Sequence, residues 1–132
     1  MAELKKYLGI DWGSKRLGLA LADNETNMAL PFKTAASLGE VLVLIDEEEI
    51  DEVIIGRPEK LSGNLGEPLT AEYLSFLEAL KKSLNIPIIE FDERLSSKAA
   101  DALGGSKKMR ASRDEIAAAI ILQNYLDAYA RN

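Results

Sequence analysis

The sequence predicts an α/β domain in which a mixed β-sheet is flanked by helices. Three short apolar segments with strand character come first, and further strands then alternate with segments whose apolar residues repeat at helical spacing. A short link between the first two strands favours an antiparallel hairpin, whereas strand–helix–strand connections require parallel pairing. The predicted order is β-β-β-α-β-α-β-α-α, and a chain of 132 residues fits one domain, residues 1–132.

The first three predicted strands form the antiparallel part of the sheet. Tyr7–Asp11 is a short apolar run that ends in a carboxylate, and Arg16–Asp23 follows after a tight turn. Gly and Ala occupy alternate positions of this second strand, which predicts that one of its faces lies close to another layer. Met28–Lys33 is a weaker strand, and Pro31 within it predicts a position at the sheet edge.

Strands and helices alternate in the rest of the chain. Apolar and β-branched runs predict strands at Glu52–Arg57 and Ile86–Asp92. Ser112 and Glu115 form a capping box that predicts the start of the last helix. A glycine-led basic loop, Gly104–Ala111, precedes it. The predicted helices are Ser37–Glu49, Leu69–Leu84, Ser96–Leu103 and Ser112–Tyr129.

The composition excludes several classes of function, because the sequence contains neither His nor Cys. Disulfides, thiolate nucleophiles, Cys- or His-ligated metals and Ser-His-Asp triads are therefore excluded. An enzyme of this composition must use carboxylates, Lys, Arg, hydroxyl groups or a metal held by oxygen ligands. Hard cations such as Mg²⁺ and Mn²⁺ prefer oxygen ligands.

The charge balance at first argues against a polyanionic partner. Sixteen Lys and Arg stand against 22 Asp and Glu, a formal net charge of −6. Such a balance weakens general attraction to nucleic acid or to an anionic membrane, unless the charges are segregated. The start of the sequence has no apolar run of signal-peptide length, and no run in the chain approaches the length of a membrane span. We therefore expect a soluble, cytoplasmic protein with no membrane partner.

Three acidic residues stand at the ends of predicted elements. Asp11 closes the first strand, Glu93 follows the last strand, and Asp114 lies at the start of the final helix. Carboxylates that converge at the carboxyl ends of strands repel one another unless cations lie between them. Two divalent ions would remove this repulsion and would also stabilise the attacking and leaving oxygens of a phosphodiester cleavage.

Each of these acids also has a purely structural interpretation. An Asp before a Gly turn is common turn chemistry, which fits Asp11. The helix dipole favours Asp114 in the first turn whether or not it binds metal. Asp92 and Glu93 would serve equally as helix caps or as partners of Arg94.

Four local sequences nevertheless resemble, in order, those of one bacterial nuclease family. They are GIDWGSKRLGLALAD, VIIGRP followed by a Ser-Gly loop, DERLSS, and DEIAAAIILQNYLD. The family is described both as Holliday junction resolvases and as pre-16S rRNA nucleases, and it has a ribonuclease-H-like fold. The resemblance spans nearly the whole chain and implies a five-stranded mixed sheet whose first three strands are antiparallel.

The resemblance also implies a set of catalytic and metal-binding residues. The Asp of the family's first motif falls on Asp11, its acidic pair falls on Asp92 and Glu93, and its final Asp falls on Asp114. Related resolvases point to Glu93 as the catalytic member of the pair, although the choice between Asp92 and Glu93 stays open. Strand alternation agrees with Glu93, because it continues the parity of Phe91. The implied cofactor is Mg²⁺ or Mn²⁺, bound as two ions.

The sequence departs from the family at two positions outside this set. Arg57 replaces an apolar residue, and Ser97 replaces a common Thr. Arg57 would alter substrate entry beside the Gly63–Gly66 loop.

Basic residues flank the predicted acidic site. Residues 94–113 carry a local net charge of +5, whereas residues 40–52 contain seven acids and no base. A basic run is often only solvated surface, but this one adjoins two of the three proposed ligands, which favours nucleic-acid binding. The candidates for contact with the nucleic-acid backbone are Lys15, Arg16, Arg94, Lys107, Lys108 and Arg110.

The resulting prediction is a metal-dependent endonuclease that matures the 5′ end of the small-subunit ribosomal RNA precursor, with ribosomal particles as further partners. The alternatives are a resolvase of four-way DNA junctions and a catalytically silent nucleic-acid-binding module. The first motif also resembles the phosphate loop of actin-like ATPases, but that class needs two such domains. Sequence leaves open whether the protein is a monomer or a weak homodimer.

Overall fold

The structure is a computed structural model that describes residues 3–13, 15–57, 68–92 and 113–130. Its strands are β1 (Lys6–Asp11), β2 (Leu17–Asp23), β3 (Leu30–Ala35), β4 (Glu52–Arg57) and β5 (Ile88–Asp92). Its helices are α1 (Leu38–Glu47), α2 (Pro68–Ser83) and α4 (Arg113–Tyr125), the last continued by a π-helical turn, Leu126–Ala130. The predicted helix Ser96–Leu103, the loops Gly63–Gly66 and Gly104–Ala111, and Ser112 of the capping box lie outside the described residues.

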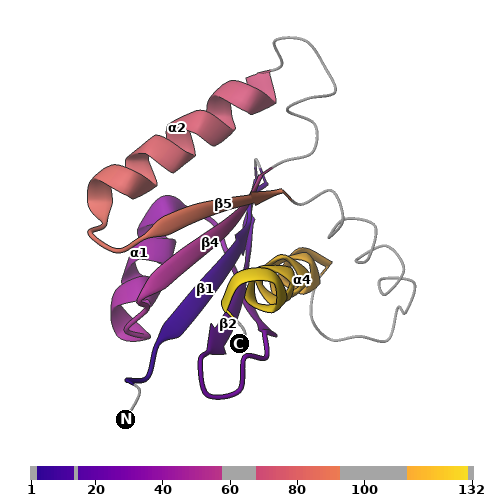
Figure 1. Ribbon diagram of the computed structural model, residues 1–132. Helices are drawn as coiled ribbons and strands as arrows, with labels where there is room; N and C mark the ends of the chain where they lie inside the picture. The colour runs from indigo at the N-terminus through magenta and orange to yellow at the C-terminus, as the bar shows by residue number, and fades with distance from the viewer. Residues whose placement is uncertain (1–2, 14, 58–67, 93–112, 131–132) are drawn as a thin grey trace.

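The five strands form one mixed sheet in the order β3-β2-β1-β4-β5 (Figure 1). β1 pairs antiparallel with β2, and β2 with β3, while β4 runs parallel to β1 and β5 runs parallel to β4. The predicted mixed sheet and its antiparallel start are therefore confirmed. β3 is an edge strand, as Pro31 predicted.

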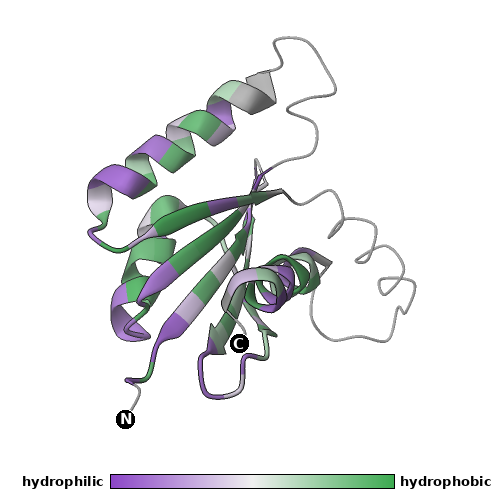
Figure 2. Ribbon diagram, viewed as in Figure 1, coloured by the Kyte–Doolittle hydropathy of each residue, from purple (hydrophilic) through white to green (hydrophobic). Residues whose placement is uncertain are grey.

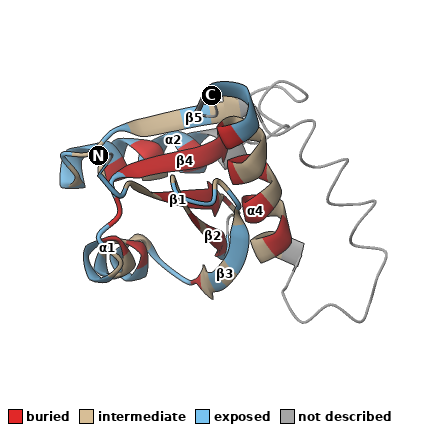
Figure 3. Cartoon of the chain, turned by 60° about the horizontal axis from the view of Figure 1, so that its bottom comes forward, coloured by how far each residue is buried: buried red, intermediate tan, exposed pale blue. Residues whose placement is uncertain are grey.

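Helices cover both faces of this sheet. α1 and α2 lie on one side and α4 on the other (Figure 1). Apolar side chains of the sheet meet each helical layer, and Figure 2 shows the strands as largely hydrophobic. Burial is deepest in the central strands β1 and β4, whereas much of edge strand β3 is exposed (Figure 3).

Alternation along β1 and β2 decides which residues face which helix. Leu8 and Ile10 pack with residues of α1 and α2, whereas Tyr7 packs with residues of α4. Gly9 faces α4 so closely that an added Cβ would lie 2.8 Å from Leu122 Cβ and 2.9 Å from the Ala118 carbonyl oxygen. The small residues of the first two strands thus let α4 approach the sheet, as their alternation predicted.

Side-chain hydrogen bonds account for the differences at the start of β3. We predicted Met28–Lys33, but the strand begins at Leu30. The preceding turn is fixed because Asp23 Oδ1 accepts hydrogen bonds from the backbone N–H groups of Glu25 and Thr26. Gln123 of α4 then accepts from Ala29 N. These contacts take the residues around Met28 out of the strand.

The other boundary differences are small. Ser37 is the N-cap of α1, not its first residue, and accepts a hydrogen bond from Glu40 N. The helix ends before Glu49, whose φ of 56° is left-handed. β5 begins at Ile88 instead of Ile86. None of the described helices combines the length and apolar character that crossing a bilayer requires.

Candidate metal centre and nucleic-acid interface

Asp11 lies at the carboxyl end of β1, between two glycines of the neighbouring strands. Its register partner is Gly18 in β2 on one side and Gly56 in β4 on the other. Asp11 shares the strand parity of Tyr7 and Gly9, and its side chain therefore belongs to the face that α4 covers. Both register partners of Asp11 are thus residues without a side chain.

The start of α4 lies directly over the same row. A Cβ added to Gly18 would collide with the Asp114 backbone carbonyl and would lie 2.8 Å from Asp114 Cβ. Adjacent strands are about 4.8 Å apart, so a residue over Gly18 is one strand away from Asp11. The structure therefore brings two of the three predicted carboxylates, Asp11 and Asp114, to neighbouring positions on one face.

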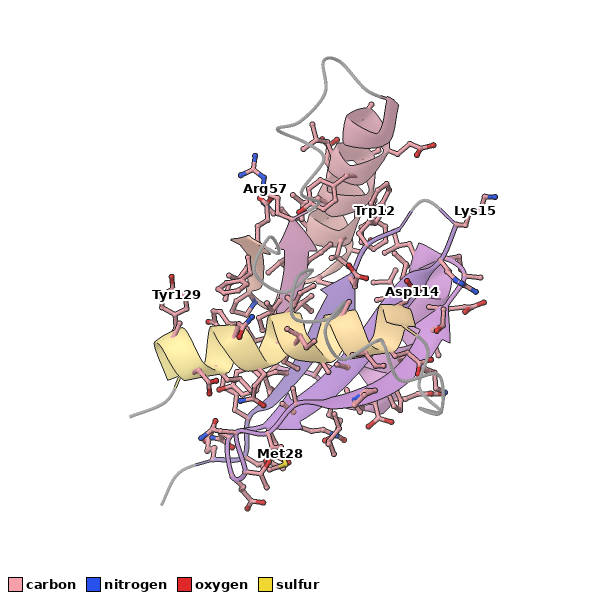
Figure 4. All side chains as sticks on the ribbon, turned by 90° about the vertical axis from the view of Figure 1, so that its right-hand side faces the viewer. Trp12, Lys15, Met28, Arg57, Asp114 and Tyr129 are labelled. Atoms are coloured by element: carbon pink, nitrogen blue, oxygen red, sulfur yellow. The ribbon has the colours of Figure 1, made fainter. Side chains whose placement is uncertain are left out.

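Arg16 forms an ion pair with Asp114. Its Nε lies 2.9 Å from Asp114 Oδ2, and the side chains are 66% and 33% exposed, respectively. Arg16 immediately precedes β2, and Lys15 beside it is exposed. Figure 4 shows Lys15 and Trp12 at the same end of the molecule as Asp114, with Tyr129 at the far end of the helix.

A further contact ties the first turn of α4 to the sheet edge. Thr34 Oγ1 in β3 donates a hydrogen bond of 2.8 Å to Glu115 Oε2. Thr34 pairs with Gly18 in the sheet register, so the row Thr34, Gly18, Asp11 runs beneath the helix start. The sequence assigned Glu115 only to a capping box, because nothing in a local motif indicates a partner in a distant strand.

The third predicted carboxylate, Glu93, lies outside the described residues. Of the residues that precede it in β5, Ile89 and Phe91 pack with α4, on the Asp11 face. Phe91 pairs with Gly56, which pairs in turn with Asp11, so these three residues form one row across the sheet. The assignment of Glu93 to the site stays a prediction. Four predicted phosphate contacts also lie outside the described residues: Arg94, Lys107, Lys108 and Arg110.

Trp12 supports the strand end that carries Asp11. It is buried and meets the ring of Tyr73 of α2 edge-on, at 5.7 Å between ring centres. Tyr73 is fully buried, and its hydroxyl donates a 3.0 Å hydrogen bond to Glu90 of β5. This chain of contacts links β1, α2 and β5 behind the site. Trp12 belongs to the first motif, GIDWGSKRLGLALAD, but nothing in that local sequence indicates its contact with α2.

The donors around Asp11 suit a hard cation. Asp11 and Asp114 offer carboxylate oxygens, which Mg²⁺ and Mn²⁺ prefer, and the sequence has no His or Cys to attract softer metals. Among residues 3–13, 15–57, 68–92 and 113–130, no cluster contains three or more potential metal ligands. Asp11 and Asp114 would thus fit such a cation as part of a larger ligand set.

Comparison with known families decides the identity. Residues 5–128 match the family RuvX, described as Holliday junction resolvase. The chain belongs to this family. Membership makes it a nuclease, a hydrolase of phosphodiester bonds, and nucleases of this kind generally use divalent metal ions.

Curated relatives of this RuvX chain match almost its full length. A protein of Rickettsia felis named "Putative pre-16S rRNA nuclease" is 37% identical over 132 aligned residues, covering 92% of this chain and 85% of that protein. A protein of Chloroflexus aggregans with the same name is also 37% identical, and the alignment covers 92% of each chain.

Solved structures share the fold at low sequence identity. The T. thermophilus RuvC in complex with a Holliday junction substrate has a TM-score of 0.64 and 15% identity, covering 94% of this chain and 96% of RuvC. The fowlpox virus resolvase, solved with Holliday junction DNA, has a TM-score of 0.57 and 14% identity over 96% and 99% of the two chains. These neighbours establish the ribonuclease-H-like fold of this RuvX chain, as the resemblance implied.

Proposed function

We propose that this chain is a divalent-metal-dependent endonuclease that matures the 5′ end of the small-subunit ribosomal RNA precursor in the cytoplasm. The observation that carries the proposal is the placement of Asp114 over Gly18, beside Asp11, at the carboxyl end of the parallel strands. The names of the curated relatives support the ribosomal substrate. Ribosomal particles are the further partner that this task implies.

Three carboxylates would hold the metal in this proposal. Asp11 and Asp114 are the described pair. We assign Glu93 as the third ligand because it has the sequence parity of Phe91, which packs on the α4 face of the sheet. The ligands would suit two Mg²⁺ or Mn²⁺ ions, which supply a reactive water at neutral pH and neutralise charge on the phosphate. Asp92 has the opposite parity, so we assign it no ligand role.

The remaining chemistry is phosphate positioning by basic side chains. Lys15 and Arg16 lie beside the carboxylates on the chain segment between β1 and β2. We assign them contacts with the nucleic-acid backbone, where each cation adds affinity that falls with salt. The same role is proposed for Arg94, Lys107, Lys108 and Arg110.

A cleavage assay tests this function. With Mn²⁺ present, the protein is offered a ribosomal RNA precursor, a four-way DNA junction and plain duplex DNA. We expect preferential cleavage of the RNA precursor and its loss in Asp11→Asn, which keeps the shape of the side chain but removes its charge. Circular dichroism controls for folding. Cleavage by Asp11→Asn at the parent rate would refute the catalytic assignment.

Resolution of four-way DNA junctions is the second candidate function. The family's description as Holliday junction resolvase favours it. Cutting two strands of a junction requires two active sites, and this function therefore needs a dimer. Preference for the junction in the cleavage assay, together with a dimer in sedimentation, would select this candidate. A monomer that prefers the RNA precursor would select the first. Failure to bind Mn²⁺ would instead favour a silent binding module.

A further inference from the structure

Arg16 is placed to do more than contact phosphate. Its guanidinium Nε lies 2.9 Å from Asp114 Oδ2, and it thereby occupies one oxygen of a carboxylate that we assign to the metal. A cation that takes this oxygen must displace Arg16, because the guanidinium and the metal would otherwise meet as like charges. The two positive groups therefore compete for one ligand atom.

We propose that Arg16 is an exchangeable counter-ion, which neutralises Asp114 before metal binds and is released by the metal to bind the substrate phosphate. This inference rests on the proposed metal role of Asp114. It predicts that metal and nucleic acid bind cooperatively, because the metal releases a phosphate-binding group and the phosphate prevents that group from returning to Asp114.

The exposure of the pair supports exchange. Arg16 is 66% exposed and Asp114 is 33% exposed, and ion pairs of this kind are weak because water screens them. A buried pair would hold Arg16 in place, whereas this pair can open without stranding a charge away from water. Release leaves the guanidinium in solvent next to Lys15, at the end of the molecule that carries Asp114 (Figure 4).

The backbone on both sides of the pair is fixed, so exchange needs only side-chain motion. Arg16 directly precedes β2, whose first residues pair with β1 and β3. Asp114 lies on α4 over Gly18, and Thr34 holds the next residue, Glu115. Rotation of the long Arg16 side chain suffices to change its partner from the carboxylate to a phosphate.

Mn²⁺ affinity, measured by calorimetry without nucleic acid, tests whether Arg16 and the metal compete for Asp114. Arg16→Gln removes the competitor, and we expect it to tighten Mn²⁺ binding by about two- to five-fold, the range of an exposed ion pair. Lys15→Gln is the matched control, since it removes the same charge one residue away, and we expect a smaller effect. Equal affinities in Arg16→Gln and the parent would overturn the inference, as would equal effects of the two variants.

A double-mutant cycle in a chelating buffer, without metal, tests whether Asp114 keeps Arg16 from the nucleic-acid phosphate. The probe is an RNA hairpin of fixed sequence, and the four proteins are the parent, Arg16→Gln, Asp114→Asn and the double variant. In the parent, Asp114 holds Arg16, so Arg16→Gln changes RNA affinity by less than about two-fold. In the Asp114→Asn background Arg16 is free, and its removal weakens RNA binding by about five-fold. Equal effects in the two backgrounds would overturn the exchange.

These experiments separate the inference from the proposed function. Suppose that the parent binds Mn²⁺ and cleaves through Asp11, but Arg16→Gln leaves Mn²⁺ affinity unchanged and has equal effects on RNA binding in the two Asp114 backgrounds. Only the exchange is then wrong. If the parent binds no Mn²⁺ at all, the metal-dependent function fails and the exchange fails with it.

Discussion

At the scale of single residues, the end of the sheet opposite the site contains a buried carboxylate. Glu52 is 5% exposed, and its two oxygens are shared between Lys5 Nζ, at 2.7 Å, and the Tyr125 hydroxyl, at 2.6 Å. Although the sequence places Glu52 in an acidic run, the structure removes it from the surface. Buried charges require such partners, because an unpaired carboxylate in a dry environment is costly.

Tyr125→Phe tests this network. The substitution leaves one oxygen of Glu52 without its donor, and we expect it to lower the free energy of unfolding by about 1–3 kcal/mol. Tyr129→Phe is the matched control, because Tyr129 is 69% exposed. Denaturant titration measures both variants, and equal stabilities would show that Glu52 does not need the tyrosine hydroxyl.

The same network predicts a loss of stability in alkali. Burial raises the pKa of Tyr125, and the hydrogen bond to Glu52 raises it further. The hydrogen bond to Glu52 raises the pKa of Lys5 as well. The unfolded Tyr ionises from about pH 10, where the native one keeps its proton, so the unfolded state binds fewer protons and stability falls as pH rises.

We therefore expect unfolding free energy to decline more steeply above about pH 10 in the parent than in Tyr125→Phe. Urea titrations between pH 8 and pH 11 would measure the two slopes. Parallel curves for the two proteins would contradict a raised tyrosine pKa.

At the scale of elements, α4 organises the site. Its first turn carries Asp114 and Glu115, and it reaches the sheet because Gly18 and Gly9 leave space beneath it. Periodicity predicted the helix, and the Gly and Ala alternation predicted the close layer. Neither indicated which residues would meet. The Arg16–Asp114 and Thr34–Glu115 contacts depend on the register of a helix against strands distant in sequence, which local patterns do not encode.

Gly18→Ala tests the docking of this helix. The added methyl group collides with backbone at Asp114, which moves less readily than a side chain, and we expect a loss of about 1–3 kcal/mol in stability together with reduced Mn²⁺ affinity. Gly39→Ala is the control, since its Cβ would meet only Ser37 Oγ at 3.7 Å inside α1. There we expect a gain of about 0.5–1 kcal/mol, because alanine favours a helix. A neutral Gly18→Ala would refute the close approach.

At the scale of the whole molecule, the acidic helix α1 and the candidate metal site lie on opposite faces of the sheet. The acidic helix α1 covers the face opposite α4 (Figure 1). Asp11, Asp114 and Arg16 belong to the α4 side. Part of the formal charge of −6 thus lies on α1, on the face away from the surface that we assign to nucleic acid. Two bound divalent cations would change the formal net charge of the protein from −6 to −2. We therefore expect nucleic-acid binding to depend on metal.

Much of this architecture is readable from the sequence. The order of elements, the antiparallel start and the edge position of β3 follow from hydrophobic periodicity, loop length and Pro31. The location of Asp11 at a strand end follows as well. Two neighbours of Asp11 are not readable in this way: Gly56, its partner in β4, and Asp114, which lies over Gly18 of β2. Their positions depend on the strand register and on the docking of α4.

The central claim is that Asp11 and Asp114 bind one metal centre jointly. Calorimetric titration of Mn²⁺ into the parent, Asp11→Asn and Asp114→Asn tests it most directly, with circular dichroism to confirm folding. We predict that the parent binds and that each Asn variant loses at least about ten-fold in affinity, because each removes a charged ligand. Parent-like Mn²⁺ affinity in either folded variant would contradict the claim.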